Sequence, residues 1–218
     1  MTLPRGLALA SALAITAGTA QAQEIGFGGN VAIVSEYIAS GVTQSSGRPA
    51  LQFTGYGYVP QGFYAGVFLS TVNFTKWDPT DRDRVELDLF LGWEGTIGNG
   101  LELDIGYEHY FYNRSGECCG VFYLGASSFV TERLELGLLM KYDPRAKDFD
   151  TRGTVAFYPT DSVGLRAMVG RSQANSHTYM NVGLDYFFTD ALTGSLDLHR
   201  ATSGWTSDKL VVGLTYSF

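Results

Sequence analysis

Carboxylates recur at a spacing of two residues in two apolar stretches of the sequence. The stretch "VELDLFLGW" carries Glu86 and Asp88, and "LELDIGYEHYF" carries Glu102, Asp104 and Glu108. In an extended chain, side chains two residues apart point to the same side, so the acidic residues face away from the Leu and Ile residues between them. Rows of carboxylates can bind cations, line an ion path or supply a general acid and base.

Basic residues continue the same polar face later in the chain. We predict an acidic wall formed by Glu86, Asp88, Glu102, Asp104 and Glu108, and a basic sector formed by Arg133, Lys141, Arg152 and Arg166. A hairpin around "IGNG" is expected to pair inward residues whose numbers sum to about 196, which puts Asp88 near Glu108 and Glu94 near Glu102. Like charges this close are tolerated where water and counterions fill the space or cations reach across.

An enzyme needs a nucleophile, a base and an orienting group in close geometry. The histidines are His109, His177 and His199, and none stands in a G-x-S-x-G or comparable context. Alternation places His109 on the apolar outer face, and His199 on the same face as Asp197. We therefore predict no catalytic residues and no cofactor, with a barrel enzyme acting on lipid as the weaker alternative.

Two further motifs could bear chemistry. Cys118 and Cys119 are adjacent, so in a regular strand their side chains face opposite ways; a strained disulfide, two thiols and an intermolecular link all stay open. Asp78, Asp81 and Asp83 share one loop and could bind a hard cation. Their spacing is not that of a calcium loop and basic residues interrupt them, so we predict a solvated loop and no metal site.

The elements that carry these side chains read as strands throughout. Twelve segments alternate between apolar and polar residues: 30–40, 49–59, 62–73, 84–95, 101–112, 118–130, 133–143, 149–158, 162–173, 177–187, 191–200 and 206–218. No helical periodicity of comparable length competes. The fold class predicted is all-β, an antiparallel transmembrane β-barrel of about 12 strands, with 10 as the alternative.

The connections fall into two classes. Tight turns follow the even-numbered segments, and longer polar loops follow the odd-numbered ones, which is typical of short periplasmic turns and longer extracellular loops. Loops near Trp77, Lys147 and Trp205 are thus expected outside, and turns near Gln61, Asn99 and Asp161 in the periplasm. The charged face must be the lumen, because Arg or Lys facing mid-membrane lipid would cost roughly 2–4 kcal/mol.

The two ends of the chain agree with an outer-membrane location in a Gram-negative bacterium. Residues 1–22 read as a signal peptide cleaved after Ala22, which leaves one barrel domain over residues 23–218. The last strand places Tyr216 and Phe218 on the apolar face. A final aromatic residue of this kind resembles the assembly signal of outer-membrane barrels, and the resemblance implies the barrel-assembly machinery and outer-membrane lipid as partners. The net charge of −7 argues against nucleic acid.

The N-terminal third resembles a known family. The segments Val34–Gln52, Gly62–Ser70 and Val85–Trp93 are similar to the TorF-like group of small proteobacterial proteins described as porins, and Leu103–Asn113 continues the resemblance more weakly. That family usually has an Arg before the glycine of the first segment, whereas Ser40 precedes Gly41 here. The resemblance implies an outer-membrane barrel with a porin-like activity.

The function predicted is therefore passive diffusion of small polar or ionic solutes through a weakly cation-selective channel. The alternative is a barrel plugged by its own side chains, acting as a structural or surface protein. Inward aromatic residues, namely Phe90, Tyr110 and Tyr112, are the ones that could close the lumen.

Overall fold

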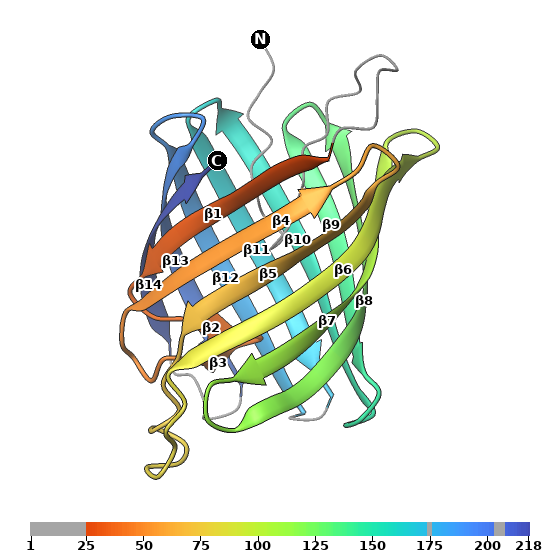
Figure 1. Cartoon of the computed structure of the whole chain (residues 1–218). Helices are drawn as coiled ribbons and strands as arrows, with labels where there is room; N and C mark the ends of the chain where they lie inside the picture. The colour runs from red at the N-terminus through yellow and green to blue at the C-terminus, as the bar shows by residue number, and fades with distance from the viewer. Residues whose placement is uncertain (1–24, 174–175, 203–207) are drawn as a thin grey trace.

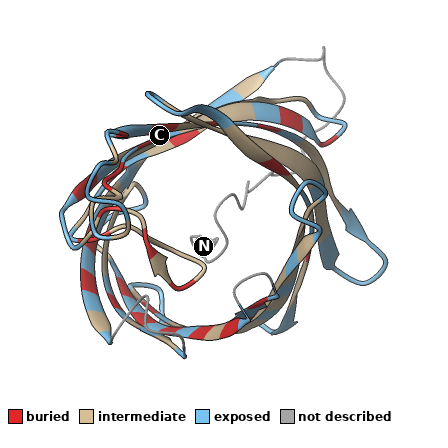
Figure 2. Cartoon of the chain, turned by 90° about the horizontal axis from the view of Figure 1, so that it is seen from below, coloured by how far each residue is buried: buried red, intermediate tan, exposed pale blue. Residues whose placement is uncertain are grey.

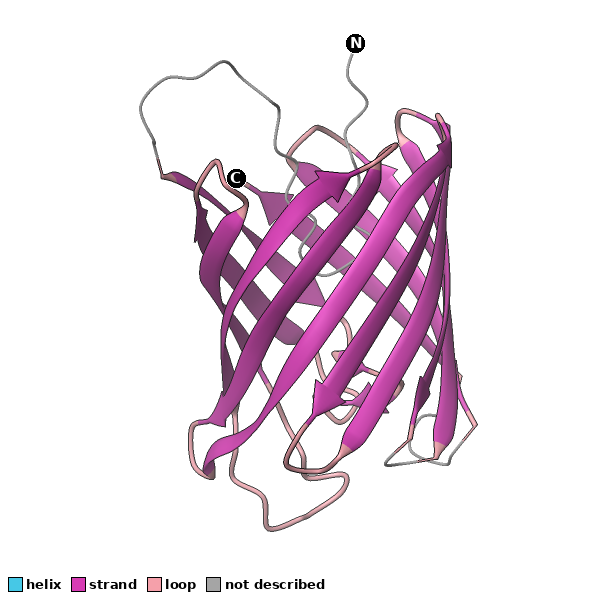
Figure 3. Cartoon of the chain, turned by 90° about the vertical axis from the view of Figure 1, so that its right-hand side faces the viewer, coloured by secondary structure: helices cyan, strands magenta, loops and turns pink. Residues whose placement is uncertain are grey.

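The chain folds into a closed antiparallel barrel of twelve strands (Figure 1). The structure is a computed structural model that describes residues 25–173, 176–202 and 208–218. The strands cross the barrel at a tilt and no helix is drawn among them (Figure 3). The prediction of an all-β barrel with twelve strands is confirmed, and the ten-stranded alternative is wrong.

Each strand pairs with its neighbour in sequence, and the last closes on the first. The barrel strands are β1 (Gly26–Val34), β4 (Ala50–Tyr58), β5 (Phe63–Thr71), β6 (Val85–Ile97), β7 (Leu101–Tyr112), β8 (Gly116–Thr131), β9 (Leu134–Asp143), β10 (Asp148–Thr160), β11 (Val163–Ser172), β12 (His177–Phe187), β13 (Leu192–Ala201) and β14 (Lys209–Ser217). A separate two-stranded hairpin consists of β2 (Ile38–Ala39) and β3 (Val42–Thr43).

The alternation in sequence becomes two faces of the barrel wall. In β6, Leu91 is 59% exposed on the outer face, whereas Asp88 on the inner face is only 2% exposed. Leu, Val, Ile and Phe side chains dominate the exposed positions of the other strands as well. A one-residue slip would reverse every side chain, so the apolar outer face fixes the register of each strand. A face this apolar is suited to lipid.

The barrel closes between β1 and β14. Val31 pairs with Tyr216, and Gly29 and Phe218 exchange two backbone hydrogen bonds of 3.1 and 3.0 Å. The Phe218 ring stacks beside Phe53 of β4, with the ring centroids 6.5 Å apart. The final aromatic residues therefore belong to the closing seam, which leaves neither strand with a free edge.

The sequence-predicted boundaries differ from the structure at both ends of the barrel. The first strand ends at Val34 instead of Ser40, because the next residues leave the wall and form the β2–β3 hairpin. The last strand begins at Lys209; residues 206 and 207 lie outside the described part. The signal peptide at residues 1–22 and Trp205 also lie outside it.

The connections divide as predicted. The loop between β5 and β6 and the β2–β3 segment lie at one end of the barrel, and the C-terminus lies at the opposite end (Figure 1). Which end faces outward stays a prediction. No helix in the described ranges is long and apolar enough to cross a membrane.

Candidate functional site: the barrel lumen and its inward hairpin

The β2–β3 hairpin is the main feature inside the barrel. Seen from the long-loop end, a short strand lies within the ring of the wall (Figure 2). At its tip, Ser40 and Gly41 have φ values of 45° and 76°, which gives a tight left-handed turn. The Ser40 carbonyl oxygen lies 2.8 Å from Nε2 of His177, and Gly41 packs on Tyr179. The hairpin thus spans from β1 to β12 and narrows the lumen.

Several contacts hold the base of the hairpin. The Tyr37 backbone N–H donates to Ser45 Oγ (2.9 Å), and Trp77 Nε1 donates to the Thr43 carbonyl (3.2 Å). Glu36 forms an ion pair with Lys209 of β14 at 3.0 Å. Burial alone would raise the pKa of Glu36, but the contact with the positively charged Lys209 helps to lower it below its usual range. The hairpin is therefore tied to both the wall and the next loop.

Two residues of the acidic wall are almost fully enclosed next to the hairpin. Glu86 is 3% exposed and Asp88 is 2% exposed. The Tyr112 hydroxyl donates to Glu86 Oε1 at 3.1 Å. Glu86 Oε2 and Asp88 Oδ1 have no hydrogen-bond partner among the described residues. The Tyr37 ring lies edge-on to Phe68 of β5, so aromatic groups surround these carboxylates.

Glu108 differs from these two because a cation reaches it. Lys141 Nζ, from β9, lies 2.9 Å from Glu108 Oε2, and the Tyr110 hydroxyl donates to the same oxygen at 2.6 Å. Both ionic side chains keep some exposed surface, 25% for Lys141 and 18% for Glu108. This pair joins the predicted acidic wall to the predicted basic sector.

The predicted pairing within the β6–β7 hairpin is wrong by one step. Paired residue numbers sum to 198, so Asp88 faces Tyr110 and Glu94 faces Asp104. The turn consists of residues 98–100 between the Ile97–Leu101 pair, with Gly98 and Gly100 at positive φ. The centre of this turn was therefore predicted one residue too early in the chain. As a result Glu86, Asp88 and Glu108 each face a tyrosine or phenylalanine, whereas Glu94 and Asp104 lie directly opposite each other.

Asp104 belongs to a tyrosine cluster closer to the short-turn end. The Tyr64 hydroxyl donates to Asp104 Oδ1 and lies 2.6 Å from the Tyr123 hydroxyl. Glu102, two residues earlier, is exposed near the turn. The acidic wall therefore extends along the whole of β6 and β7, with its members in different surroundings.

The cations of the basic sector lie beside carboxylates. Arg166 Nε and Nη2 donate to the two oxygens of Asp185 at 2.6 and 2.8 Å, and Nη2 lies 3.1 Å from Asp197. Asn181 Nδ2 donates to Asp197 at 3.1 Å and lies 3.2 Å from His199 Nε2. His199 is thus part of the lumen wall, as predicted, inside a network of ion pairs.

Arg152 and Arg133 occupy different surroundings. Arg152 Nε lies 3.8 Å from Asp150, which also accepts a 2.5 Å hydrogen bond from Tyr179. The prediction that Arg133 lies in the lumen wall is wrong. Arg133 is exposed in the turn between β8 and β9 and donates to the Pro159 carbonyl, since β9 begins one residue later.

Sequence reasoning did not assign Asp150 or Asp185 to the lumen. Both share the inward parity of Arg152 on β10 and of Asn181 on β12, which is the signal that could have identified them. They turn the basic sector into a region of mixed charge.

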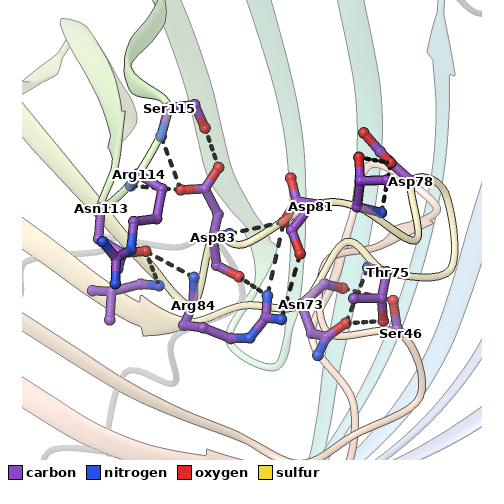
Figure 4. A network of polar contacts seen from close by, with 12 residues as sticks. Ser46, Asn73, Thr75, Asp78, Asp81, Asp83, Arg84, Asn113, Arg114 and Ser115 are labelled. Atoms are coloured by element: carbon purple, nitrogen blue, oxygen red, sulfur yellow. Dashed lines mark hydrogen bonds and ion pairs between the residues drawn. The ribbon is translucent and has the colours of Figure 1, made fainter.

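The loop between β5 and β6 is only partly solvated (Figure 4). Asp83 is 3% exposed; its carboxylate accepts the backbone N–H of Arg114 at 2.7 Å and that of Ser115 at 3.1 Å, and Ser115 Oγ also donates to it. Asp78 instead caps its own turn through Thr80. The prediction of a solvated loop is wrong for Asp83, which joins this loop to the one between β7 and β8.

The same loop also supports the base of the inward hairpin. Ser46 Oγ donates to the Asn73 carbonyl at 2.6 Å, and the Asn73 N–H donates to the Gln44 carbonyl at 2.8 Å (Figure 4). Arg84 forms an exposed ion pair with Asp81 at 3.8 Å. Polar contacts of this loop therefore reach both Ser115 and the base of the β2–β3 hairpin.

Cys118, Cys119 and His109 are the remaining candidates from the sequence. Cys118 and Cys119 form a disulfide with each other. His109 lies on the outer face, as predicted, and its Nδ1 lies 2.7 Å from the Tyr107 hydroxyl. Within the described ranges, no group of three or more His, Cys, Asp and Glu side chains could hold a metal ion.

Solved structures with a similar fold include porins. The chain superimposes on the KdgM porin with a TM-score of 0.67 at 11% identity, covering 88% of this chain and 99% of KdgM. A KdgM porin in complex with disordered oligogalacturonate superimposes with a TM-score of 0.63 at 11% identity, covering 88% of this chain and 98% of that one. The NanC porin superimposes with a TM-score of 0.58 at 12% identity, covering 88% of this chain and 99% of NanC. At these identities the likeness shows the fold alone.

Sequence comparison identifies the family. No curated protein matches the chain. The TorF-like resemblance stays a prediction, because the description of the family model that matches does not carry that name. That model is described as "Bacterial protein of unknown function (Gcw_chp)" and covers residues 17–199. The protein therefore belongs to the Gcw_chp family of bacterial proteins.

Proposed function

We propose that the barrel is a porin-like channel for small polar solutes and cations, narrowed by the β2–β3 hairpin. The observation that carries the proposal is the charge of the inner face. Lumen-facing strand positions hold the carboxylates Glu86, Asp88, Glu94, Glu102, Asp104, Glu108, Glu135, Asp150, Asp185 and Asp197, and the cations Lys141, Arg152, Arg166 and Lys209. Charged walls of one prevailing sign attract counterions and raise their local concentration.

The exposure of these side chains supports a water-filled path. Arg166 keeps 21% of its side-chain surface exposed although it is ion-paired with two carboxylates. The side chains of Lys141 and Arg152 keep 25% and 20% of their surface exposed. A barrel core filled by apolar side chains would bury charged groups only at a large cost in free energy. Partly exposed ion pairs around the wall therefore favour an open lumen over a plugged one.

The excess of carboxylates in the lumen also favours solutes that differ from the molecule bound in one of the similar structures. One KdgM structure contains oligogalacturonate, an acidic sugar chain. A polyanion would meet the excess of carboxylates on β6 and β7 here, which is unfavourable electrostatically. We therefore assign this channel to cations and neutral polar solutes.

Outer-membrane placement is part of the same proposal. The apolar outer face and the barrel closure support it. Export through a signal peptide at residues 1–22 and a role of Tyr216 and Phe218 in recognition by the barrel-assembly machinery are included as proposals.

Swelling of proteoliposomes tests the proposed function. The mature barrel is reconstituted in phosphatidylcholine liposomes, which are diluted into isotonic solutions of arabinose, lysine or glutamate. Swelling is expected to be fastest in lysine, intermediate in arabinose and slowest in glutamate. Swelling no faster than that of protein-free liposomes in all three solutes would instead support the plugged barrel.

A further inference from the structure

A row of polar side chains crosses the outer face at the long-loop rim of β11, β12 and β13, which lie side by side (Figure 1). Arg171 of β11 pairs with Thr178 of β12, and Arg171 Nη1 donates to Thr178 Oγ1 at 3.1 Å. One step lower, Met180 pairs with Arg200 of β13. Alternation places all four side chains on the outer face, away from the lumen.

A shallow hollow of about 300 Å³ lies between these groups. Thr178, Met180, Arg200, Ala201 and Thr202 line it. Thr202 closes the upper edge, where its N–H donates to the Thr178 carbonyl and its hydroxyl accepts the Thr178 N–H. The hollow therefore combines threonine side chains with a guanidinium group, and Arg171 borders it from the neighbouring strand.

The surface beneath the hollow is apolar. Exposed outward residues continue down the same three strands, with Val169 at 54%, Val182 at 59% and Leu198 at 51% exposure. Arginine at this height stands where the hydrocarbon-facing band ends, which is the level of lipid headgroups. The opposite rim has a different composition, since Arg133 is the basic residue that the structure places in its turns.

The charges of the hollow remain available to a ligand. The described ion-pair partner of Arg200 is Asp208, at 3.4 Å, and the two side chains are 68% and 63% exposed. An exposed ion pair of this kind contributes little to stability, so a ligand can readily take the place of Asp208 at Arg200. Arg171 has a threonine hydroxyl as its partner and no carboxylate among the described residues. Two guanidinium groups and hydroxyl donors suit a phosphate, which arginine binds through paired hydrogen bonds.

We propose that this hollow, between Arg171 and Arg200, binds the phosphate of an anionic lipid headgroup in the outer leaflet. The acyl chains of that lipid lie along Val169, Val182 and Leu198. The occupant is a lipid and not free phosphate, because the apolar surface directly below the guanidinium groups adds area that only acyl chains can cover. The inference rests on the membrane placement proposed above and does not depend on conduction.

Native mass spectrometry of the mature barrel in a neutral detergent tests the site. The barrel is titrated with phosphatidic acid, with phosphatidylcholine as the neutral lipid. We expect preferential binding of phosphatidic acid, weakened about tenfold by R171Q or R200Q alone and more by the double variant, since each removes charge-assisted hydrogen bonds. The R171K/R200K variant should retain most of the binding, which separates charge from a loss of structure.

The matched control is R82Q/R145Q, which removes two exposed arginines from other loops at the same end. An equal loss of binding in the control would mean diffuse attraction and would overturn the site. Displacement of the lipid by millimolar inorganic phosphate would identify free phosphate as the ligand and overturn the lipid assignment, as would equal binding of both lipids. Swelling rates of the same variants in phosphatidylcholine liposomes report conduction separately, so failure here is distinguishable from failure of the channel.

Discussion

The carbonyl oxygen of Ser40 and Nε2 of His177 lie 2.8 Å apart although 137 positions separate them in sequence. This hydrogen bond joins the tip of the inward hairpin to the first residue of β12. His177 is 1% exposed, so the contact is made away from bulk water. The position of the hairpin in the lumen depends on this contact and on the packing of Gly41 next to it.

Replacing His177 by Ala is expected to release the hairpin tip. A net loss of about 1 kcal/mol for the hydrogen bond raises the fraction of displaced hairpin roughly fivefold. Single-channel recordings should show larger and noisier currents. H109A, on the outer face, should leave the current unchanged; unchanged noise in H177A would show that the hairpin is held by other contacts.

Replacing Gly41 by Ala is expected to destabilise the hairpin more strongly. A Cβ at this position would lie 2.4 Å from Tyr179 Cβ, at a φ of 76° that favours glycine. We expect a loss of about 1–3 kcal/mol, measured by urea unfolding in micelles. Gly47 has a similar φ of 78° but only Lys209 Nζ nearby, at 3.9 Å. G47A should therefore lose less, and equal losses would contradict the packing argument.

Replacing Arg166 by Gln is expected to leave two facing carboxylates unpaired. The exposed fraction of 21% moderates the effect, so we expect a loss of about 2 kcal/mol in the free energy of unfolding. R145Q removes an ion pair with Glu117 whose side chains are 64% and 44% exposed, and should cost less than about 1 kcal/mol. Equal effects of the two substitutions would show that the Arg166 pairs are as weak as a surface pair.

The buried Asp83 carboxylate joins the β5–β6 loop to the β7–β8 loop, a contact that we call the Asp83 clamp. We predict that this contact is lost in acid. Burial opposes ionisation, but hydrogen bonds from Ser115 and the backbone of Arg114 and Ser115 outweigh it and lower the pKa of Asp83. A lowered pKa in the folded state stabilises the clamp above the unfolded pKa of about 3.9, and this stabilisation is lost as the pH falls through the folded pKa.

Cleavage of the β5–β6 loop by pepsin measures this effect. Cleavage should rise steeply in wild-type protein as the pH falls below about 3.9. In D83N the loop should already be open and cleavage should follow only the pH profile of pepsin itself. Parallel profiles for the two proteins would exclude Asp83 as the titrating group.

The side of the barrel wall on which each strand residue lies could be predicted from sequence, because successive side chains of a strand point to opposite faces. The inward position of Glu86, Asp88 and Glu108 follows directly from alternation with Leu and Ile. The prediction failed where the backbone departs from this period. Positive φ at Gly98 and Gly100 shifts the β6–β7 pairing by one step. Arg133 lies in a turn although its number has inward parity.

The hairpin and the loop clamp could not be predicted from the pattern. Ser40 ends an apparently regular strand segment and Gly41 follows it, and only tertiary contacts with His177 and Tyr179 show that the chain turns inward. Asp83 looks like the exposed Asp78 of the same loop in sequence. Its burial depends on Ser115, which lies on another loop. Contacts between residues distant in sequence carry no local signal.

Neutralising part of the acidic wall should change ion selectivity. In D88N/D104N/E108Q the permeability ratio of K⁺ to Cl⁻ should fall, because the wall loses negative charge while its size is kept. The outer-face variant E117Q is the matched control for removal of a carboxylate and should leave the ratio unchanged. An unchanged ratio in the triple variant would show that these carboxylates are structural.

The reversal potential of the wild-type barrel in a KCl gradient tests the central claim most directly. The mature protein is inserted into a planar bilayer of neutral lipid with KCl more concentrated on one side. Discrete current steps with a reversal potential displaced toward the K⁺ equilibrium potential are predicted from the acidic lumen. Absence of steps, or a displacement toward the Cl⁻ equilibrium potential, would contradict the assignment of this barrel as a cation-preferring channel.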